Sequence, residues 1–147
     1  MDNKWTPSDV AAATVREVRG KRGMTVAELA ARCAELGAPQ LTAQALYKLE
    51  ARRPGKLRPR PVTVDELLTL ACALDIAPVY LLTGLGDDGG PYPVTGNVAD
   101  RTDRVREWIR GTIEGGLMRG VDRLAYLTTR PESVTARLRV TEEGSED

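Results

Sequence analysis

The chain of 147 residues contains no histidine and no phenylalanine, and it has only three serines, at positions 8, 133 and 145. Without histidine it can form neither a His-ligated metal site nor a Ser–His or Cys–His pair for nucleophilic catalysis. No run of apolar residues approaches the ~18 that span a bilayer, and none follows the N-terminus as in a signal peptide. We therefore expect a cytoplasmic protein that is not an enzyme, needs no cofactor and does not bind membranes.

Cysteine is also scarce. The two cysteines, Cys33 and Cys72, are too few for a disulfide scaffold and lie far apart in the sequence. Each falls within an apolar pattern of helical period, so we expect both to be buried, reduced thiols.

The formal net charge is zero, but the charges are unevenly distributed. Residues 1–86 hold 12 basic and 9 acidic side chains, a net charge of +3, whereas residues 87–147 hold 9 and 12, a net charge of −3. Between positions 48 and 60 there are six cations and a single acid, Glu50. The cations are Lys48, Arg52, Arg53, Lys56, Arg58 and Arg60. Such a cluster directly after a helix favours an anionic partner over a merely solvated loop.

Five helices are predicted in residues 1–84. Three of them begin with a threonine followed three residues later by an acid, which is the pattern of a capping box. The pairs are Thr6 with Asp9, Thr25 with Glu28, and Thr63 with Glu66. A short third helix is expected over residues 42–51, and a fifth begins at Pro78. The apolar face of the second helix is predicted to be Val26, Leu29, Ala30, Cys33 and Leu36. No convincing strand is found, so the fold class is predicted to be all-α.

Four stretches carry a family resemblance. They are VREVR at 15–19, MTVAELA at 24–30, TAQALYKLE at 42–50 and LACALDI at 70–76, the last followed by YLL at 80–82. In this order they resemble the Cro/C1-type helix-turn-helix family, also called the XRE family of bacterial and phage transcriptional regulators. The resemblance covers about half of the chain. It implies a five-helix, lambda-repressor-like DNA-binding domain in residues 1–84.

The helix over residues 42–51 is interpreted as the major-groove reader, because the second helix of a helix-turn-helix unit enters that groove. Gln44 can form a bidentate bond with adenine, Lys48 can reach the acceptors of guanine, and Ala43 can offer a methyl contact. Thr42 and the hydroxyl of Tyr47 are candidate phosphate donors. The alternative is that these side chains are simply solvated.

The basic loop after this helix would supply affinity that does not depend on base sequence. We expect phosphate contacts from Arg52, Arg53 and Lys56. Arg58 and Arg60 are further candidates, although some cations of the loop must be solvated.

In the XRE family, an arginine late in the first helix pairs with the glutamate that ends the recognition helix. Arg19 and Glu50 match these positions, so the resemblance implies an ion pair that orients the reader. Two features depart from the family pattern. Val26 stands where a phosphate-binding glutamine is common, and both the turn before Thr42 and the loop after Glu50 are longer than in compact members.

Residues 85–97 are rich in glycine and proline and are predicted to be a linker. Asn97 is expected to cap a helix that opens a small, mainly helical region over residues 98–140. The apolar residues Val98, Val105, Trp108 and Ile109 are expected to form a stripe for dimerisation, or else the core of a small domain. So short a region makes only a thin core by itself, which favours dimerisation.

Two further segments follow. The pattern of residues 131–140 suits a strand or a helix, and both assignments stay open. The acidic residues 141–147 are predicted to be disordered.

The sequence therefore predicts a sequence-specific, double-stranded-DNA-binding regulator, most simply a dimeric repressor on a palindromic operator. Activation stays open, as do phage, antitoxin and host roles. The alternative function is a protein–protein interaction adaptor on the same fold, antitoxin-like or an anti-regulator, with little or no DNA binding.

Overall fold

The computed structural model of the protein describes residues 5–52, 60–86, 89–113 and 116–117. The chain divides into two compact units, Met1–Thr102 and Asp103–Asp147. Within the described ranges there are six helices and one two-stranded sheet. The expected largely helical fold is confirmed, but the all-α class is wrong, because residues 91–101 form an antiparallel hairpin. The predicted segments within residues 118–147 lie outside the described residues.

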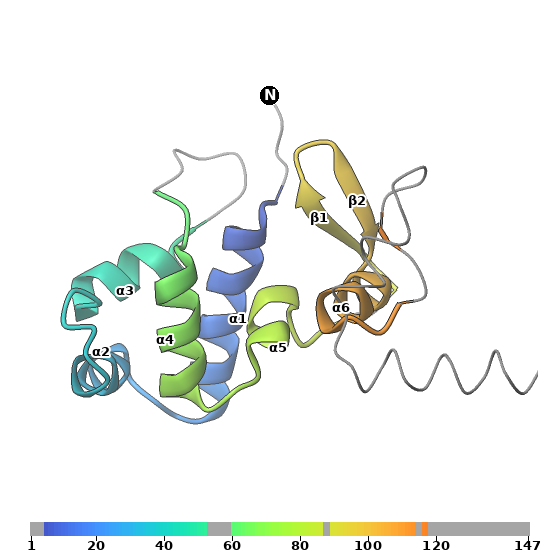
Figure 1. The fold of residues 1–147 in the computed structure, drawn as a ribbon. Helices are drawn as coiled ribbons and strands as arrows, with labels where there is room; N and C mark the ends of the chain where they lie inside the picture. Colours follow the sequence, from blue (N-terminus) through green and yellow to red (C-terminus); the bar gives the residue numbers. More distant parts are fainter. Residues whose placement is uncertain (1–4, 53–59, 87–88, 114–115, 118–147) are drawn as a thin grey trace, which may run out of the picture. The chain divides into compact units, whose positions relative to one another are not determined.

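Helix α1 (Pro7–Lys21) lies at the centre of the first unit (Figure 1). It contacts α3 (Ala43–Glu50), α4 (Val64–Leu74) and α5 (Pro78–Thr83). Helix α2 (Val26–Glu35) packs against α3 and α4 on the side of the unit away from α5. The order of helices along the chain is therefore the predicted one.

The capping boxes that the sequence predicts at the helix N-termini are confirmed. Both hydrogen bonds of the capping box are present at the first residues of α1, α2 and α4, where Thr6, Thr25 and Thr63 are the N-caps. Each pair satisfies backbone N–H groups that a helix leaves without an internal partner. Pro78 opens α5, and Gly84 ends it with a φ of 85°, in the region that favours glycine.

Helices α1 to α5 all contribute side chains to the core of this unit. Cys33 is completely buried in it, and burial raises the pKa of its thiol. Two sequence expectations are wrong here. Cys72 is exposed on α4, and Leu36 is 54 % exposed because α2 ends at Glu35 and the chain turns away. The largest buried side chains of the core are Leu29, Leu41, Leu46, Leu70, Leu74 and Leu81.

The turn between α2 and α3 is fixed by apolar side chains. Gly37 has a φ of 94°, which reverses the chain after α2. Ala38 and Leu41 follow, and both are buried in the core. The turn is therefore longer than in compact helix-turn-helix units but is anchored at two points.

The predicted linker contains a strand, so that prediction is wrong. Strand β1 (Pro91–Thr95) pairs with β2 (Val98–Arg101), so that Thr95 lies opposite Val98. The intervening Gly96-Asn97 is a two-residue hairpin connection, and Asn97 therefore lies in a turn rather than at a helix start. The next helix, α6 (Thr102–Arg110), begins four residues later than expected. The first unit accordingly ends at Thr102 instead of residue 84.

The hairpin is attached to the helices by Tyr92. Its ring is 4 % exposed, and its hydroxyl donates a hydrogen bond of 2.8 Å to the carbonyl of Leu82 in α5. Burial raises the pKa of Tyr92 to about 12, because the phenolate would lose its hydration.

Raising the pH should therefore destabilise the protein through Tyr92. The folded-state pKa lies above the unfolded value of about 10, so the full stabilisation is present below pH ~10 and is lost as the pH rises towards 12. The expected loss is about 2–3 kcal/mol in the free energy of unfolding, measured by urea denaturation at intervals across this range. Tyr92→Phe should remove this component. The exposed Tyr47→Phe is the control, and equal pH profiles for the two variants would contradict the assignment.

Candidate nucleic-acid interface

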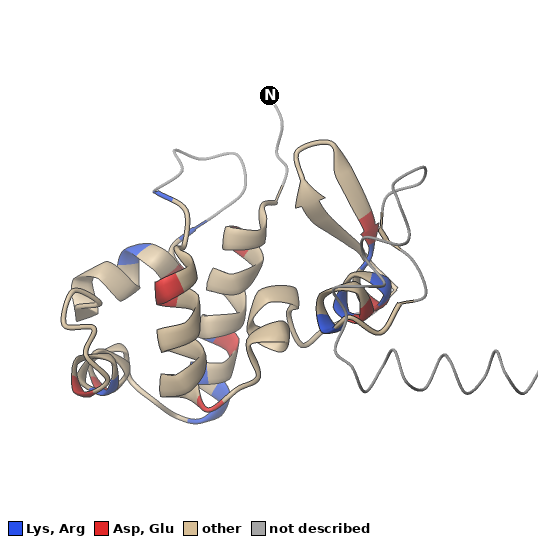
Figure 2. Ribbon diagram, in the orientation of Figure 1, with Lys and Arg blue, Asp and Glu red and all other residues tan. Residues whose placement is uncertain are grey.

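Helix α3 presents one side to solvent. Gln44, Tyr47 and Lys48 share a face because they are separated by three and four residues, and all three are exposed, Tyr47 by 62 %. The other side is held by Leu46, which is completely buried, and by the half-buried Leu49. Figure 2 shows a basic residue within α3 and an acidic stretch at the start of α4. The structure thus brings three of the predicted DNA-contacting side chains onto one exposed face.

Thr42 and Ala43, the first two residues of the predicted reader, make different contacts from Gln44, Tyr47 and Lys48. Thr42 is the N-cap of α3, and its hydroxyl accepts a hydrogen bond of 3.2 Å from the N–H of Ala45. The same hydroxyl keeps its proton, which it can donate to a phosphate oxygen. Ala43 is half-buried and packs against the core, so only part of its surface can meet a base.

An ion pair connects α3 to α1, as the family resemblance implied. The Nε and Nη2 atoms of Arg19 donate to the two carboxylate oxygens of Glu50 at 2.7 and 3.0 Å. Nη1 of Arg19 donates to the carbonyl of Met24 at 2.8 Å. The side chains of Arg19 and Glu50 are only 19 % and 7 % exposed. Arg19 therefore ties together α1, the turn that follows it and the end of α3.

Arg52 does not fit the predicted role of a phosphate contact, and that prediction is wrong. Its side chain is 4 % exposed, and Nε donates at 3.0 Å to Oδ1 of Asp9, which is 2 % exposed. Nη1 donates at 2.8 Å to the carbonyl of Arg60. Arg52 is turned inward because the buried carboxylate at the first turn of α1 requires a cation.

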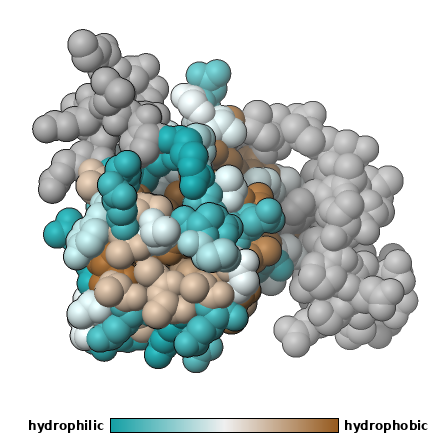
Figure 3. Space-filling model, turned by 90° about the vertical axis from the view of Figure 1, so that its left-hand side faces the viewer, coloured by the Kyte–Doolittle hydropathy of each residue, from teal (hydrophilic) through white to brown (hydrophobic). Residues whose placement is uncertain are grey.

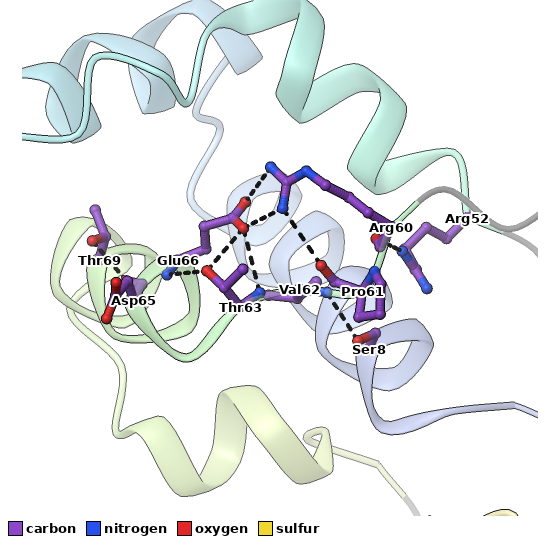
Figure 4. A network of polar contacts seen from close by, with 9 residues as sticks. All are labelled: Ser8, Arg52, Arg60, Pro61, Val62, Thr63, Asp65, Glu66 and Thr69. Carbon is purple, nitrogen blue, oxygen red and sulfur yellow. Dashed lines mark hydrogen bonds and ion pairs between the residues drawn. The ribbon is translucent and has the colours of Figure 1, made fainter.

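Arg60 is held in a second pair, with Glu66 at the start of α4 (Figure 4). Its guanidinium donates to both oxygens of Glu66, at 3.0 Å to Oε2, and Glu66 also accepts from the hydroxyl of Thr63 at 2.9 Å. The N–H of Val62 donates to the hydroxyl of Ser8 at 3.0 Å. These contacts fix both ends of the basic loop, at residues 52 and 60. The remaining cations, Arg53, Lys56 and Arg58, lie outside the described residues.

The two acids of this network have lowered pKa values. Burial by itself would raise the pKa of Asp9, but hydrogen bonds from Thr6 and the Arg52 guanidinium lower it below its ordinary value. For Glu66 the hydrogen bond from Arg60 is the largest cause, and it lowers the pKa against the effect of burial. Both groups therefore stay ionised at neutral pH, as the anchoring of the loop requires.

The exposed side chains of α2 are three alanines and the charged Glu28, Arg32 and Glu35. Ala27, Ala31 and Ala34 are all exposed, and Val26 is 4 % exposed. Figure 3, which looks onto the side formed by α2 and α3, shows a weakly hydrophobic patch surrounded by hydrophilic residues. Val26 is therefore part of the core, and its side chain has no donor with which to replace the family's glutamine.

The predicted dimerisation stripe is not formed, so that prediction is wrong. Val98 lies in β2, whereas the other three residues lie in α6. Val105 is completely buried within a single copy of the chain, Trp108 is half-buried, and Ile109 is 37 % exposed. A helical period beginning after Asn97 does not describe this segment, because residues 98–101 form a strand.

No local sequence signal predicts the pair of Asp9 with Arg52, because the two residues are 43 positions apart. Asp9 was identified only through its separate role in the capping box. The hairpin does have a local signal, since Gly96-Asn97 lies between the β-forming residues of its two strands.

No family model, curated protein or solved structure matches the chain. The likeness to the XRE family accordingly depends on the sequence stretches and the helix order given above. Across the described residues, no helix combines the length and apolar character needed to cross a membrane, and α1, with 15 residues, is the longest.

Proposed function

We propose that this protein is a sequence-specific, double-stranded-DNA-binding transcriptional regulator whose α3 reads the major groove. The observation that carries the proposal is the construction of α3. One face exposes Gln44, Tyr47 and Lys48, while Glu50 at its end is locked to Arg19. A helix that reads bases must present polar side chains outward and must hold a fixed orientation on its domain, and α3 meets both requirements.

The exposed side chains suit the major groove. A glutamine amide can donate and accept at the same adenine, and a lysine ammonium can donate to the two acceptors of guanine. Thr42, at the N-terminal end of α3, and the hydroxyl of Tyr47 suit phosphate oxygens beside the groove. We assign the domain a lambda-repressor-like, five-helix architecture, with the hairpin as an addition after α5.

The regulator is proposed to be a repressor that binds a palindromic operator as a homodimer. Reading two half-sites with identical domains requires two-fold symmetry in the protein. Occupying an operator is sufficient for repression, and no further chemistry is then required of the chain.

Selection of bound sequences from random duplexes at near-physiological salt tests the proposal. A recurrent palindrome is the expected result. No enrichment would contradict it and would favour an interaction adaptor on the same fold, for which the exposed alanines of α2 and the buried Val26 would then be the first surface to examine.

Substitutions in α3 should change base preference as well as affinity. Gln44→Ala or Lys48→Ala should weaken binding to the selected site by ~1–3 kcal/mol and relax specificity at one position, measured by fluorescence anisotropy. Lys21→Ala is the matched control, because Lys21 is an exposed lysine that pairs with Glu17 on α1. If Lys48→Ala changed neither affinity nor base preference, α3 would not be the reader.

The loop should behave differently from α3. Arg53→Ala should weaken binding to all duplexes to a similar extent and should reduce the slope of log affinity against log salt by about one unit. The measurement is a salt titration with the selected site and with a scrambled duplex. A loss confined to the selected site would assign Arg53 to base reading instead.

A further inference from the structure

The outward face of α4 is apolar. Val64 is 72 % exposed, Leu68 is 49 % exposed, and Cys72 is exposed one helical turn further on. These three residues are spaced by four, so they form one stripe along the helix. The other outward residues are Asp65 and Thr69, which leaves one charged side chain on this face. Because the solvent face of a surface helix is ordinarily charged or polar, the stripe indicates a contact surface.

We propose that this stripe, Val64–Leu68–Cys72, is a contact with a second copy of the chain, in which two α4 helices pack antiparallel around a two-fold axis at Leu68. Leu68 is the midpoint of the stripe, four residues from each end. A two-fold axis there places Leu68 against Leu68 of the other copy, and Val64 against Cys72. The surface is therefore complementary to itself in this arrangement, as a two-fold interface requires.

The charges at the two ends of α4 favour the antiparallel direction. Among the described residues at its start, Asp65 is exposed and Glu66 is paired with Arg60, which sums to −1. At its end, Arg22 donates to the carbonyl of Asp75 at 3.2 Å and Arg32 to the carbonyl of Ala73 at 3.0 Å. With the carboxylate of Asp75 included, this end sums to +1. Antiparallel packing brings each −1 end against a +1 end, whereas parallel packing would oppose like charges.

The expected dimer is weak. A helix of eleven residues is about 16 Å long, and one face of it covers less than the ~800 Å² per partner that stable complexes bury. Dimerisation should therefore depend on protein concentration in the micromolar range or above. The proposal does not depend on DNA binding, because the stripe contains none of the side chains assigned to the reader.

Sedimentation of the full chain over a range of concentrations, without DNA, tests the contact. The wild type should shift from monomer towards dimer, and Leu68→Asp should stay monomeric at concentrations where the wild type is mostly dimeric. Leu36→Asp is the matched control, because it places the same charge at another exposed leucine outside α4. Dimerisation that Leu68→Asp leaves unchanged would overturn the proposal. So would a wild type that stays monomeric up to about 500 µM, far above a micromolar dissociation constant.

Engineered disulfides test the packing direction without relying on a destabilising charge. Leu68→Cys combined with Cys72→Ser should form a disulfide-linked dimer under mild oxidation, whereas Ala31→Cys in the same background should not. Val64→Cys should cross-link with the native Cys72 of the other copy and should lose this cross-link in the Cys72→Ser background.

The native Cys72 pair distinguishes the two directions. In the antiparallel dimer the two Cys72 residues are separated by about 12 Å along the helix axes, which is beyond disulfide reach. Efficient Cys72–Cys72 cross-linking of the wild type would therefore overturn the antiparallel arrangement. A monomeric chain in which the Leu68→Cys thiol is shielded from reagents would also overturn the proposal and would point to residues 118–147 of the same chain as the cover.

Discussion

Replacing Arg52 by alanine is expected to lower the free energy of unfolding by about 3–5 kcal/mol. The substitution leaves the carboxylate of Asp9, which is 2 % exposed, without its guanidinium partner, and an uncompensated buried charge has a cost of this size. It also removes the hydrogen bond from Arg52 to the carbonyl of Arg60, which joins the ends of the basic loop. Urea denaturation followed by circular dichroism measures the loss.

Two comparisons separate this effect from ordinary loss of a surface charge. Lys21→Ala removes an exposed pair with Glu17 and should cost no more than about 1 kcal/mol. The double substitution Asp9→Asn with Arg52→Met should recover part of the loss, because it removes both charges from the same buried position. A loss of less than 1 kcal/mol in Arg52→Ala would show that Asp9 is solvated.

The pair of Asp9 with Arg52 also predicts how the free energy of unfolding changes at acid pH. The folded-state pKa of Asp9 lies below its unfolded value, so its stabilisation is present above pH ~4 and is lost as the pH falls through the folded-state pKa. In Arg52→Ala, burial still opposes the ionisation of Asp9, but one of the hydrogen bonds that favour the ionised carboxylate is missing. Acid unfolding of Arg52→Ala should therefore begin at a higher pH than in the wild type.

Removing Arg19 should lower the free energy of unfolding by about 1–3 kcal/mol. The carboxylate of Glu50, whose side chain is only 7 % exposed, would lose its guanidinium partner, and the carbonyl of Met24 would lose its donor. The matched control is Arg16→Ala, which removes an exposed arginine from the same helix.

A double-mutant cycle on Arg19 and Glu50 isolates the pair itself. A coupling free energy of at least 0.5 kcal/mol is expected, because the two residues form two direct hydrogen bonds. Arg19→Ala should also reduce DNA affinity beyond its effect on stability, since the orientation of α3 depends on the pair. A coupling near zero would mean that α3 is oriented by packing alone.

The helices of residues 5–86 were predictable because their signals are local. A threonine cap and an acid three residues later lie within one turn, and such pairs at Thr6, Thr25 and Thr63 fix where α1, α2 and α4 begin. The period of apolar residues then indicates the buried face. This signal fails at the last turn of a helix, which is why Leu36 was assigned to the core although it is exposed.

The site was only partly predictable, for a physical reason. The exposure of Gln44, Tyr47 and Lys48 follows from the period of α3, which is a local property. Whether a cation of the basic loop faces solvent or a buried acid depends on residues far away in the sequence. Arg52 was therefore interpreted by the charge of its neighbours, while its actual role is set by Asp9. The apolar period of α4 predicts a buried Cys72 and therefore no outward stripe, whereas Cys72 is exposed.

The hydrogen bond from Arg52 to the carbonyl of Arg60 has a consequence for sequence change in this protein. It joins the two ends of the loop directly, and the pair of Arg60 with Glu66 attaches the second end to α4. The contacts of residues 52 and 60 therefore hold the end of α3 close to the start of α4. Closing a longer loop costs little entropy, about 0.6 kcal/mol for each doubling of its length. Insertions and deletions at 53–59 should therefore be tolerated, so that the number and reach of the loop cations can change while α3 keeps its orientation.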